Sequence, residues 1–180
     1  MIAHKRLYLI GMPASGKSTW GRQLALAWNW RFLDLDVAIE ARTGMRIPEI
    51  FAAHGEAYFR EREREALHAT KQHQQTIIAT GGGTPCFFDN LEFINREGVS
   101  VFLEVPLDSL LQRLRRRGNH RPLFSEQDQE KLRRQLHEKY RLRLPYYEQA
   151  HLRIAAESFP LLRLADKIQL WEYDQLRSKK

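Results

Sequence analysis

Residues 9–21 read LIGMPASGKSTWG and form the most informative segment of the chain. Positions 11–18 match the phosphate-loop pattern G-x-x-x-x-G-K-[ST] at every fixed position. An apolar run precedes the match, and a segment with helical character follows it. Glycines let backbone N–H groups turn toward a chain of phosphates, and the following helix directs its positive end at the same charge. The stretch therefore predicts a binding site for a nucleoside triphosphate between a strand and a helix.

Two side chains of this loop have predicted roles of their own. We expect Lys17 to reach the β- and γ-phosphates and the Ser18 hydroxyl to ligate Mg²⁺. The alternative interpretation is a glycine-rich turn with a solvated lysine. The strand-to-helix context favours the phosphate site over that turn.

The rest of the chain alternates between apolar runs and helical segments. Apolar runs without polar alternation are typical of strands that are buried on both faces, which predicts a parallel sheet covered by helices on each side. The expected strands lie at 5–11, 31–36, 76–83, 99–106 and 151–154. The expected helices lie at about 17–30, 36–73 with breaks near 44–48 and 55, 87–98, from 107 onward, 126–142 and 160–176.

Length and composition narrow the class of protein. A chain of 180 residues predicts one domain, 1–180. The sequence contains no apolar run of about 20 residues, the length needed to span a membrane. We therefore expect no membrane partner, and we expect no targeting segment. Cys86 is the single cysteine, so a disulfide framework is excluded and a reducing, cytoplasmic setting is expected.

The net charge of +7 has two possible meanings, a nucleic-acid partner or a small anionic ligand. Much of the excess lies in RLRRRGNHR, residues 113–121. This segment lacks the interleaved aromatic side chains and the long basic face that nucleic-acid binding favours. The charge pattern therefore favours a small anion, and no nucleic-acid partner is expected.

Two polar motifs follow neighbouring strands of the predicted sheet. Asp34 and Asp36 end the second strand, and three glycines, 81–83, end the third. Ligands of open α/β sheets bind at this edge, and strand alternation places both aspartates on one side. One carboxylate could hold the water shell of Mg²⁺, and the other could orient or deprotonate an acceptor hydroxyl. A helix N-cap and a flexible turn are the alternative interpretations of the two motifs.

Two further segments supply arginines. In GEAYFREREREAL, residues 55–67, helical spacing places Arg60 and Glu63 on one face, although a solvated, salt-bridged helix has the same composition. In RLRLPYYE, residues 141–148, Arg143 precedes Pro145 at a helix end.

Taken in order, these motifs resemble the shikimate kinases, a family of P-loop proteins related to nucleoside monophosphate kinases. The resemblance runs from about residue 7 to residue 153 and includes RPLF at 121–124. It implies a three-layer α/β/α fold with a five-stranded parallel sheet, a substrate-binding helical region at about 36–64 and a mobile lid at about 115–126. It also implies transfer of the γ-phosphoryl of ATP to the 3-hydroxyl of shikimate, with Mg²⁺, in aromatic amino acid biosynthesis.

The resemblance implies that ATP is bound mainly by the phosphate loop. Lys17 and Arg121, the latter closing from the lid over the phosphoryl, would be catalytic. Ser18 would ligate Mg²⁺ directly and Asp34 through water, and Arg113 would stack on adenine. The implied ATP contacts are Gly11, Ala14, Ser15, Gly16, Lys17, Ser18, Thr19, Arg113 and Arg121.

The same resemblance implies how shikimate is bound. Asp36 would contact its hydroxyls and act as the catalytic base, while Arg60 and Arg143 would bind its carboxylate, a group that suits the planar guanidinium fork. Glu63 would hold Arg60 in place. Phe51 and Phe59 would line the ring, and Gly82 and Gly83 would offer backbone N–H groups.

Three other functions remain open on the sequence. A related small-molecule kinase, such as a gluconate kinase, would share the phosphate loop but is not expected to have both arginines with D-x-D and the glycines. A regulatory nucleotide-binding module would be expected to lose Lys17, Asp34, Asp36 or Arg60, all of which are present. A nucleic-acid-binding NTPase would bind polynucleotide with strong salt dependence. One departure from the family pattern, Leu123–Phe124 after RP, affects the packing of the lid. The partners expected are shikimate and ATP, bound by a monomer.

Overall fold

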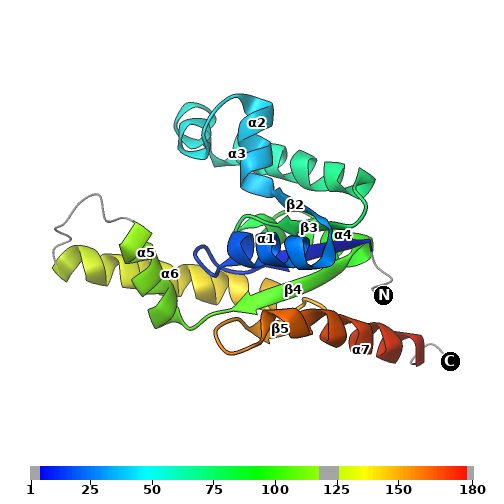
Figure 1. The fold of residues 1–180 in the computed structure, drawn as a ribbon. Helices are drawn as coiled ribbons and strands as arrows, with labels where there is room; N and C mark the ends of the chain where they lie inside the picture. Colours follow the sequence, from blue (N-terminus) through cyan, green and yellow to red (C-terminus); the bar gives the residue numbers. More distant parts are fainter. Residues whose placement is uncertain (1–4, 118–125, 178–180) are drawn as a thin grey trace.

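The computed structural model describes residues 5–117 and 126–177 (Figure 1). Five strands pair in parallel in the order β2-β3-β1-β4-β5, which confirms the predicted five-stranded parallel sheet. The strands are β1 (Arg6–Ile10), β2 (Arg31–Asp34), β3 (Thr76–Ala79), β4 (Val99–Glu104) and β5 (Leu152–Ala155).

The helices follow the predicted order, with differences at their ends. The α-helices are α1 (Lys17–Trp28), α2 (Leu35–Thr43), α3 (Ile47–Ala69), α4 (Asn90–Glu97), α5 (Leu107–Arg117), α6 (Glu126–Tyr147) and α7 (Leu164–Arg177). Short 3₁₀ turns, η1 (Thr70–Gln72), η2 (Thr84–Cys86) and η3 (Leu161–Arg163), complete the list. The predicted end of α6 at residue 142 is wrong, because the helix continues past Pro145 and the Glu148 N–H still donates to the Leu144 carbonyl at 2.9 Å.

Successive residues of β1 point to opposite faces of the sheet and separate two apolar cores. Tyr8 and Ile10 face the core that α3, α4, α5 and α6 cover. Leu7 and Leu9 face the core that α1 and α7 cover. The predicted three-layer α/β/α arrangement is therefore confirmed.

The strand order places the phosphate loop at the centre of the sheet. The chain passes from β1 to β2 and returns to β3 on one side, then crosses to β4 and β5 on the other. The order thus reverses beside β1, and ligands of such sheets bind beyond the carboxyl ends of the strands at this point. The loop between β1 and α1 lies there.

The α2–α3 region rises beside the β2 edge of the sheet, whereas α7 lies beside β5 at the opposite edge (Figure 1). Both predicted breaks in this region are present. Gly44 ends α2 with a φ of 69°, and Gly55 interrupts α3 with a φ of 78° and a ψ of 178°. Within residues 5–117 and 126–177, no helix is both long and apolar enough to cross a membrane.

Candidate active site

The phosphate loop turns sharply between β1 and α1. Gly11, Ala14 and Gly16 have φ angles of 139°, 65° and 100°, in the region that favours glycine. A Cβ on Gly11 would lie 2.8 Å from the Leu103 carbonyl oxygen, so β4 leaves no room for a side chain there. Gly16 begins α1 without a side-chain cap, which leaves the first N–H groups of this helix to an anion.

Lys17 stabilises the loop from inside. Its side chain is 8% exposed, and its ammonium group donates to the carbonyl oxygens of Gly11 at 2.9 Å and Met12 at 2.8 Å. A buried ammonium group needs such partners because the loss of its water is costly. The positive charge is thereby held in the loop, next to the cavity where phosphates are expected.

A polar cavity of about 180 Å³ opens in front of this loop. Its lining comes from the phosphate loop, from the turn between β2 and α2, and from the segment after β3, as the sheet edge predicts. The lining residues are Pro13, Ala14, Gly16, Lys17, Ser18, Thr19, Asp34, Asp36, Thr80 and Gly82.

Ser18 and Asp34 form the pair that the sequence predicts for a cation. The Ser18 hydroxyl donates to an Asp34 carboxylate oxygen at 2.6 Å. Hydroxyl and carboxylate oxygens are the hard ligands that Mg²⁺ prefers, and Mg²⁺ keeps several waters and takes phosphate oxygens from its substrate. Among the described residues, no group of three or more histidines, cysteines, aspartates or glutamates gathers to hold a metal. These donors fit an ion held jointly with a nucleotide.

Asp36 does not lie on a strand, and the predicted strand alternation of the two aspartates is wrong. β2 ends at Asp34, whose carboxylate caps α2 by accepting from the Asp36 N–H at 3.2 Å. Asp36 therefore lies in the first turn of α2, because capping by Asp34 ends the strand two residues earlier than the pattern suggests and starts the helix at Leu35. Both side chains still line the same cavity.

The environment of Asp36 favours its protonated form. Burial raises the pKa of Asp36 to about 6, and the carboxylates of Asp34 and Glu63 add to this, while Lys17 opposes it. Several carboxylates with few nearby cations make this corner of the cavity electronegative. Such a site gains from a cation, and a carboxylate with a pKa near neutrality can accept a proton from a hydroxyl.

The glycine triplet, Gly81–Gly83, connects the two sides of the site. A Cβ on Gly81 would approach the Asp36 carboxylate to 3.0 Å, and one on Gly82 would approach Arg143 Nη1 to 3.1 Å. A Cβ on Gly83 would lie 2.9 Å from Arg60 Nη1. Because these positions have no side chains, two carboxylates, those of Asp36 and Glu63, and two guanidinium groups can pack directly against the backbone.

Arg60 is held rigidly beside Gly83. It is 8% exposed, and its Nη1 donates to Glu63 at 2.7 Å, as predicted, while Nη2 donates to Glu56 at 2.9 Å. Glu63 also accepts from the Thr84 hydroxyl at 2.6 Å. The guanidinium carbon lies 4.0 Å from the centre of the Phe87 ring, which covers one face of the group.

Arg143 reaches the triplet from the opposite side, from α6. Its Nη1 atom is buried and has no hydrogen-bond partner among the described residues. A buried guanidinium nitrogen without a partner is costly, and an anion would supply the missing acceptor. Arg60 and Arg143 both lie near Cys86, whose pKa each of them lowers, although burial, the largest effect, raises it to about 11.

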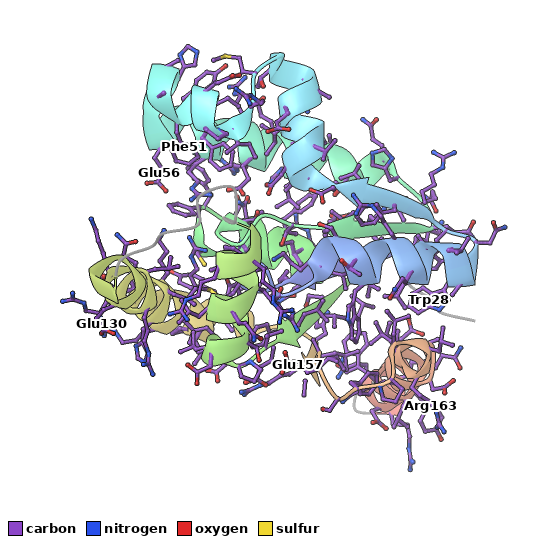
Figure 2. The ribbon with its side chains drawn as sticks, turned by 60° about the vertical axis from the view of Figure 1, so that its left-hand side comes forward. Trp28, Phe51, Glu56, Glu130, Glu157 and Arg163 are labelled. Carbon is purple, nitrogen blue, oxygen red and sulfur yellow. The ribbon has the colours of Figure 1, made fainter. Side chains whose placement is uncertain are left out.

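Phe51 and Phe59 lie side by side in the α2–α3 region, with ring centroids 4.7 Å apart. Phe59 is 4% exposed, whereas Phe51 is 38% exposed. Figure 2 shows Phe51 and Glu56 close together on the side of this region that is turned toward the rest of the molecule.

Arg113 lies at a second cavity, of about 440 Å³, on the other side of the phosphate loop. Its Nη1 donates to the carbonyls of Ala14 and Ser15, and its Nη2 donates to Glu157 at 2.8 Å. Glu157 follows β5 and lies near α5 (Figure 2). The predicted lid residue Arg121 lies outside the described residues, as does most of the expected lid at 115–126.

Four residues of the site were missed by the sequence analysis. Phe87 covers Arg60, Thr84 supports Glu63, Tyr147 donates to the Gly82 carbonyl, and Ala156 lines the cavity beside Arg113. Thr84 and Phe87 lie within four residues after the triplet, and Tyr147 lies in the RLRLPYYE motif. The sequence shows that these residues lie near the motifs, but their contacts depend on how distant segments pack.

Comparison with known proteins gives one consistent family. A family model described as shikimate kinase matches residues 13–170. The shikimate kinase of Parabacteroides distasonis is 40% identical over 85% of this chain and 88% of its own length. That of Phocaeicola vulgatus is 40% identical over 97% of both chains.

Solved structures agree with the sequence relatives. The crystal structure of a shikimate kinase from Bacteroides thetaiotaomicron superimposes with a TM-score of 0.79 at 37% identity, covering 95% of this chain and 98% of that one. A shikimate kinase from Acinetobacter baumannii, in complex with shikimate, gives the same score at 34% identity, covering 97% of this chain and 96% of that one.

Proposed function

The chain belongs to the shikimate kinase family and phosphorylates shikimate with ATP, and from this premise we propose how its residues share the work. One observation carries the assignment of the acceptor site. The glycine triplet is flanked by two guanidinium groups, and one of them, Arg143, has a buried nitrogen without a partner among the described residues. This arrangement suits a carboxylate, which accepts several hydrogen bonds from two guanidinium groups.

The carboxylate of shikimate binds between Arg60 and Arg143. Arg60 is already oriented by Glu63 and Phe87, so little side-chain entropy is lost when the anion binds. The N–H groups of Gly82 and Gly83 face the same ligand, and Phe51 and Phe59 line its ring. With the carboxylate end held there, the hydroxyl end of shikimate points toward Asp36.

Asp36 is the catalytic base for the 3-hydroxyl. As the acceptor oxygen forms its bond to the γ-phosphorus, the bond from that phosphorus to the β–γ bridging oxygen breaks, and the hydroxyl proton passes to the Asp36 carboxylate. The products are shikimate 3-phosphate and ADP. Phosphoryl transfer depends mainly on positioning and charge, so a carboxylate with a pKa of about 6 is a sufficient base.

The nucleotide occupies the other half of the site. The phosphate loop binds the triphosphate through its N–H groups, and Lys17 neutralises the transferring phosphoryl. Ser18 and Asp34 would hold Mg²⁺, which, when bound, neutralises charge that develops on the phosphate oxygens. Arg113 borders the adenine, and Arg121 closes from the lid.

The setting of the enzyme is also a proposal. The single cysteine, Cys86, supports a reducing compartment, and we assign the protein to the cytoplasm as a monomer. Residues 36–64 act as the substrate-binding region and 115–126 as the lid of one domain.

The first test measures ADP release from ATP and Mg²⁺ with shikimate, gluconate or a nucleoside monophosphate as acceptor. Only shikimate is expected to support turnover. Arg60→Ala is expected to raise the KM for shikimate by about 10- to 100-fold, because a buried charge-assisted interaction is lost. Turnover with another acceptor would overturn the assignment of the substrate.

Arg64→Ala is the matched control for Arg60→Ala. Arg64 lies one turn further along α3, where its guanidinium group pairs with Asp89 at 2.8 Å and is 45% exposed. Removing it deletes an arginine from the same helix without touching the triplet. We expect its KM for shikimate to stay within twofold of the unaltered enzyme. Equal effects of both variants would count against a carboxylate site at Arg60.

A further inference from the structure

Tyr147 is a fully buried side chain that joins three parts of the site. It is the last residue of α6, is 0% exposed, and stacks on Phe102 of β4 with ring centroids 5.0 Å apart. Its hydroxyl donates to the Gly82 carbonyl oxygen at 2.5 Å and lies 3.6 Å from the sulfur of Met12 in the phosphate loop. A single oxygen therefore connects α6, the glycine triplet and the phosphate loop.

The hydroxyl keeps its proton under ordinary conditions. Burial raises the pKa of Tyr147, and the nearby Arg143 guanidinium only partly offsets this. Arg143 lies four residues earlier on α6, one helical turn from Tyr147 and on the same side of the helix. The helix therefore presents a cation and a neutral donor together to the triplet.

The bond to Gly82 fixes more than one atom. The Gly82 carbonyl and the Gly83 N–H belong to one planar trans peptide unit and point in opposite directions. A glycine pair can rotate such a unit easily, because neither residue has a Cβ. Holding the oxygen toward Tyr147 therefore holds the Gly83 N–H on the other side. Within the described residues, no acceptor receives a hydrogen bond from the Gly82 or Gly83 N–H.

We propose that Tyr147 is a positioning residue for the acceptor, which orients the Gly82–Gly83 peptide so that its N–H group is directed at bound shikimate. This inference rests on the proposed function of the triplet. Tyr147 itself does not touch the substrate. It acts through the peptide, and it links that peptide to the helix that carries Arg143.

Tyr8 is a matched control for a purely structural role. It is also 0% exposed, and its hydroxyl shares a hydrogen bond of 2.8 Å with the Thr70 hydroxyl. Thr70 belongs to η1, before β3, whereas the triplet follows β3. Tyr8→Phe therefore removes a buried tyrosine hydrogen bond at the opposite end of the sheet from the active site.

The experiment compares Tyr147→Phe with Tyr8→Phe. Both variants keep the aromatic ring and are expected to lower Tm by similar amounts. Tyr147→Phe is expected to raise the KM for shikimate by about tenfold, because the peptide is no longer held, and to change the KM for ATP by less than twofold. Tyr8→Phe is expected to leave both KM values within twofold. An unchanged KM for shikimate in folded Tyr147→Phe, or an equal rise in Tyr8→Phe, would overturn the proposal.

A second measurement needs no variant. Labelling with ¹⁵N-glycine gives signals from only 10 residues. Addition of shikimate is expected to shift the Gly83 amide signal strongly and that of Gly44, at the end of α2, hardly at all. An unshifted Gly83 amide at saturating shikimate would overturn the inference even if Tyr147→Phe did not fold. If the unaltered enzyme showed no shikimate-dependent turnover, that result would instead refute the proposed function itself.

Discussion

The phosphate-binding side and the acceptor-binding side of this site are built in different ways. The phosphate loop uses main-chain groups and one lysine from eight consecutive residues, 11–18. The acceptor side uses side chains from α2, α3 and α6 around a glycine triplet that follows β3. A contiguous loop can bind phosphates of any nucleotide, whereas side chains from distant elements define one acceptor. The substrate specificity of this enzyme therefore depends on how its helices pack.

The largest expected effect is on the acceptor side, at Asp36. Asp36→Asn keeps the shape of the side chain but cannot accept the proton, so kcat is expected to fall by about 10²- to 10⁴-fold. The dissociation constant for ATP should change by less than threefold, because the phosphate loop is intact. Steady-state kinetics and ATP titration by calorimetry measure the two quantities. A large loss of ATP affinity would show that the two sides are not separable.

The same variant is expected to be more stable. A raised carboxyl pKa favours the protonated form in the folded state, so the stability that Asp36 contributes is present below pH 3.8 and is lost as pH rises through about 6. Asparagine removes this cost, which amounts to at most about 3 kcal/mol at pH 7. Denaturant unfolding at pH 7 and pH 4 should show a gain that becomes much smaller at the lower pH.

The next effect is on the pH profile of the unaltered enzyme. With the pKa of Asp36 near 6, kcat/KM for shikimate should fall about tenfold per pH unit below that value. ATP binding in the absence of shikimate should show no such step, because in the proposed mechanism Asp36 accepts a proton from the acceptor and is not a ligand of the nucleotide. Initial rates between pH 5 and 8 at saturating ATP measure the profile. A flat profile would argue against Asp36 as the base.

The sequence alone was sufficient to predict the structure of the phosphate-binding side but not that of the acceptor-binding side. The phosphate loop could be predicted because its function lies in consecutive residues whose local conformation is set by glycines. Asp36 was predicted in the site but on the wrong element, since the Asp34 carboxylate accepts a hydrogen bond from the Asp36 N–H and so ends the strand at Asp34. Phe87 and Tyr147 were missed, because an aromatic residue has the same sequence pattern whether it packs in a core or holds an arginine or a peptide.

Gly82 tests whether the two sides meet at one residue. A Cβ there would lie 2.6 Å from the Pro13 ring of the phosphate loop and 3.1 Å from Arg143. Gly82→Ala is therefore expected to raise the KM values for both ATP and shikimate, each by about tenfold. Gly11→Ala, whose Cβ would meet the Leu103 carbonyl, should affect ATP alone. If Gly82→Ala changed only one of the two KM values, the triplet would contribute only to the binding of that substrate.

The smallest effect is expected for the pair of charged side chains, Arg113 and Glu157, beside the phosphate loop on the nucleotide side. Arg113 and Glu157 form an ion pair at 2.8 Å, but both side chains are more than a third exposed, and such pairs contribute little. The Arg113 guanidinium also donates to the Ala14 and Ser15 carbonyls, so it keeps its place without Glu157. Glu157→Gln is thus expected to raise the KM for ATP by less than about fivefold at low salt and to leave the KM for shikimate unchanged. The test measures both KM values at 20 mM and 500 mM NaCl. A rise in the KM for ATP that is larger than fivefold and depends on salt would show that this ion pair contributes substantially to nucleotide binding.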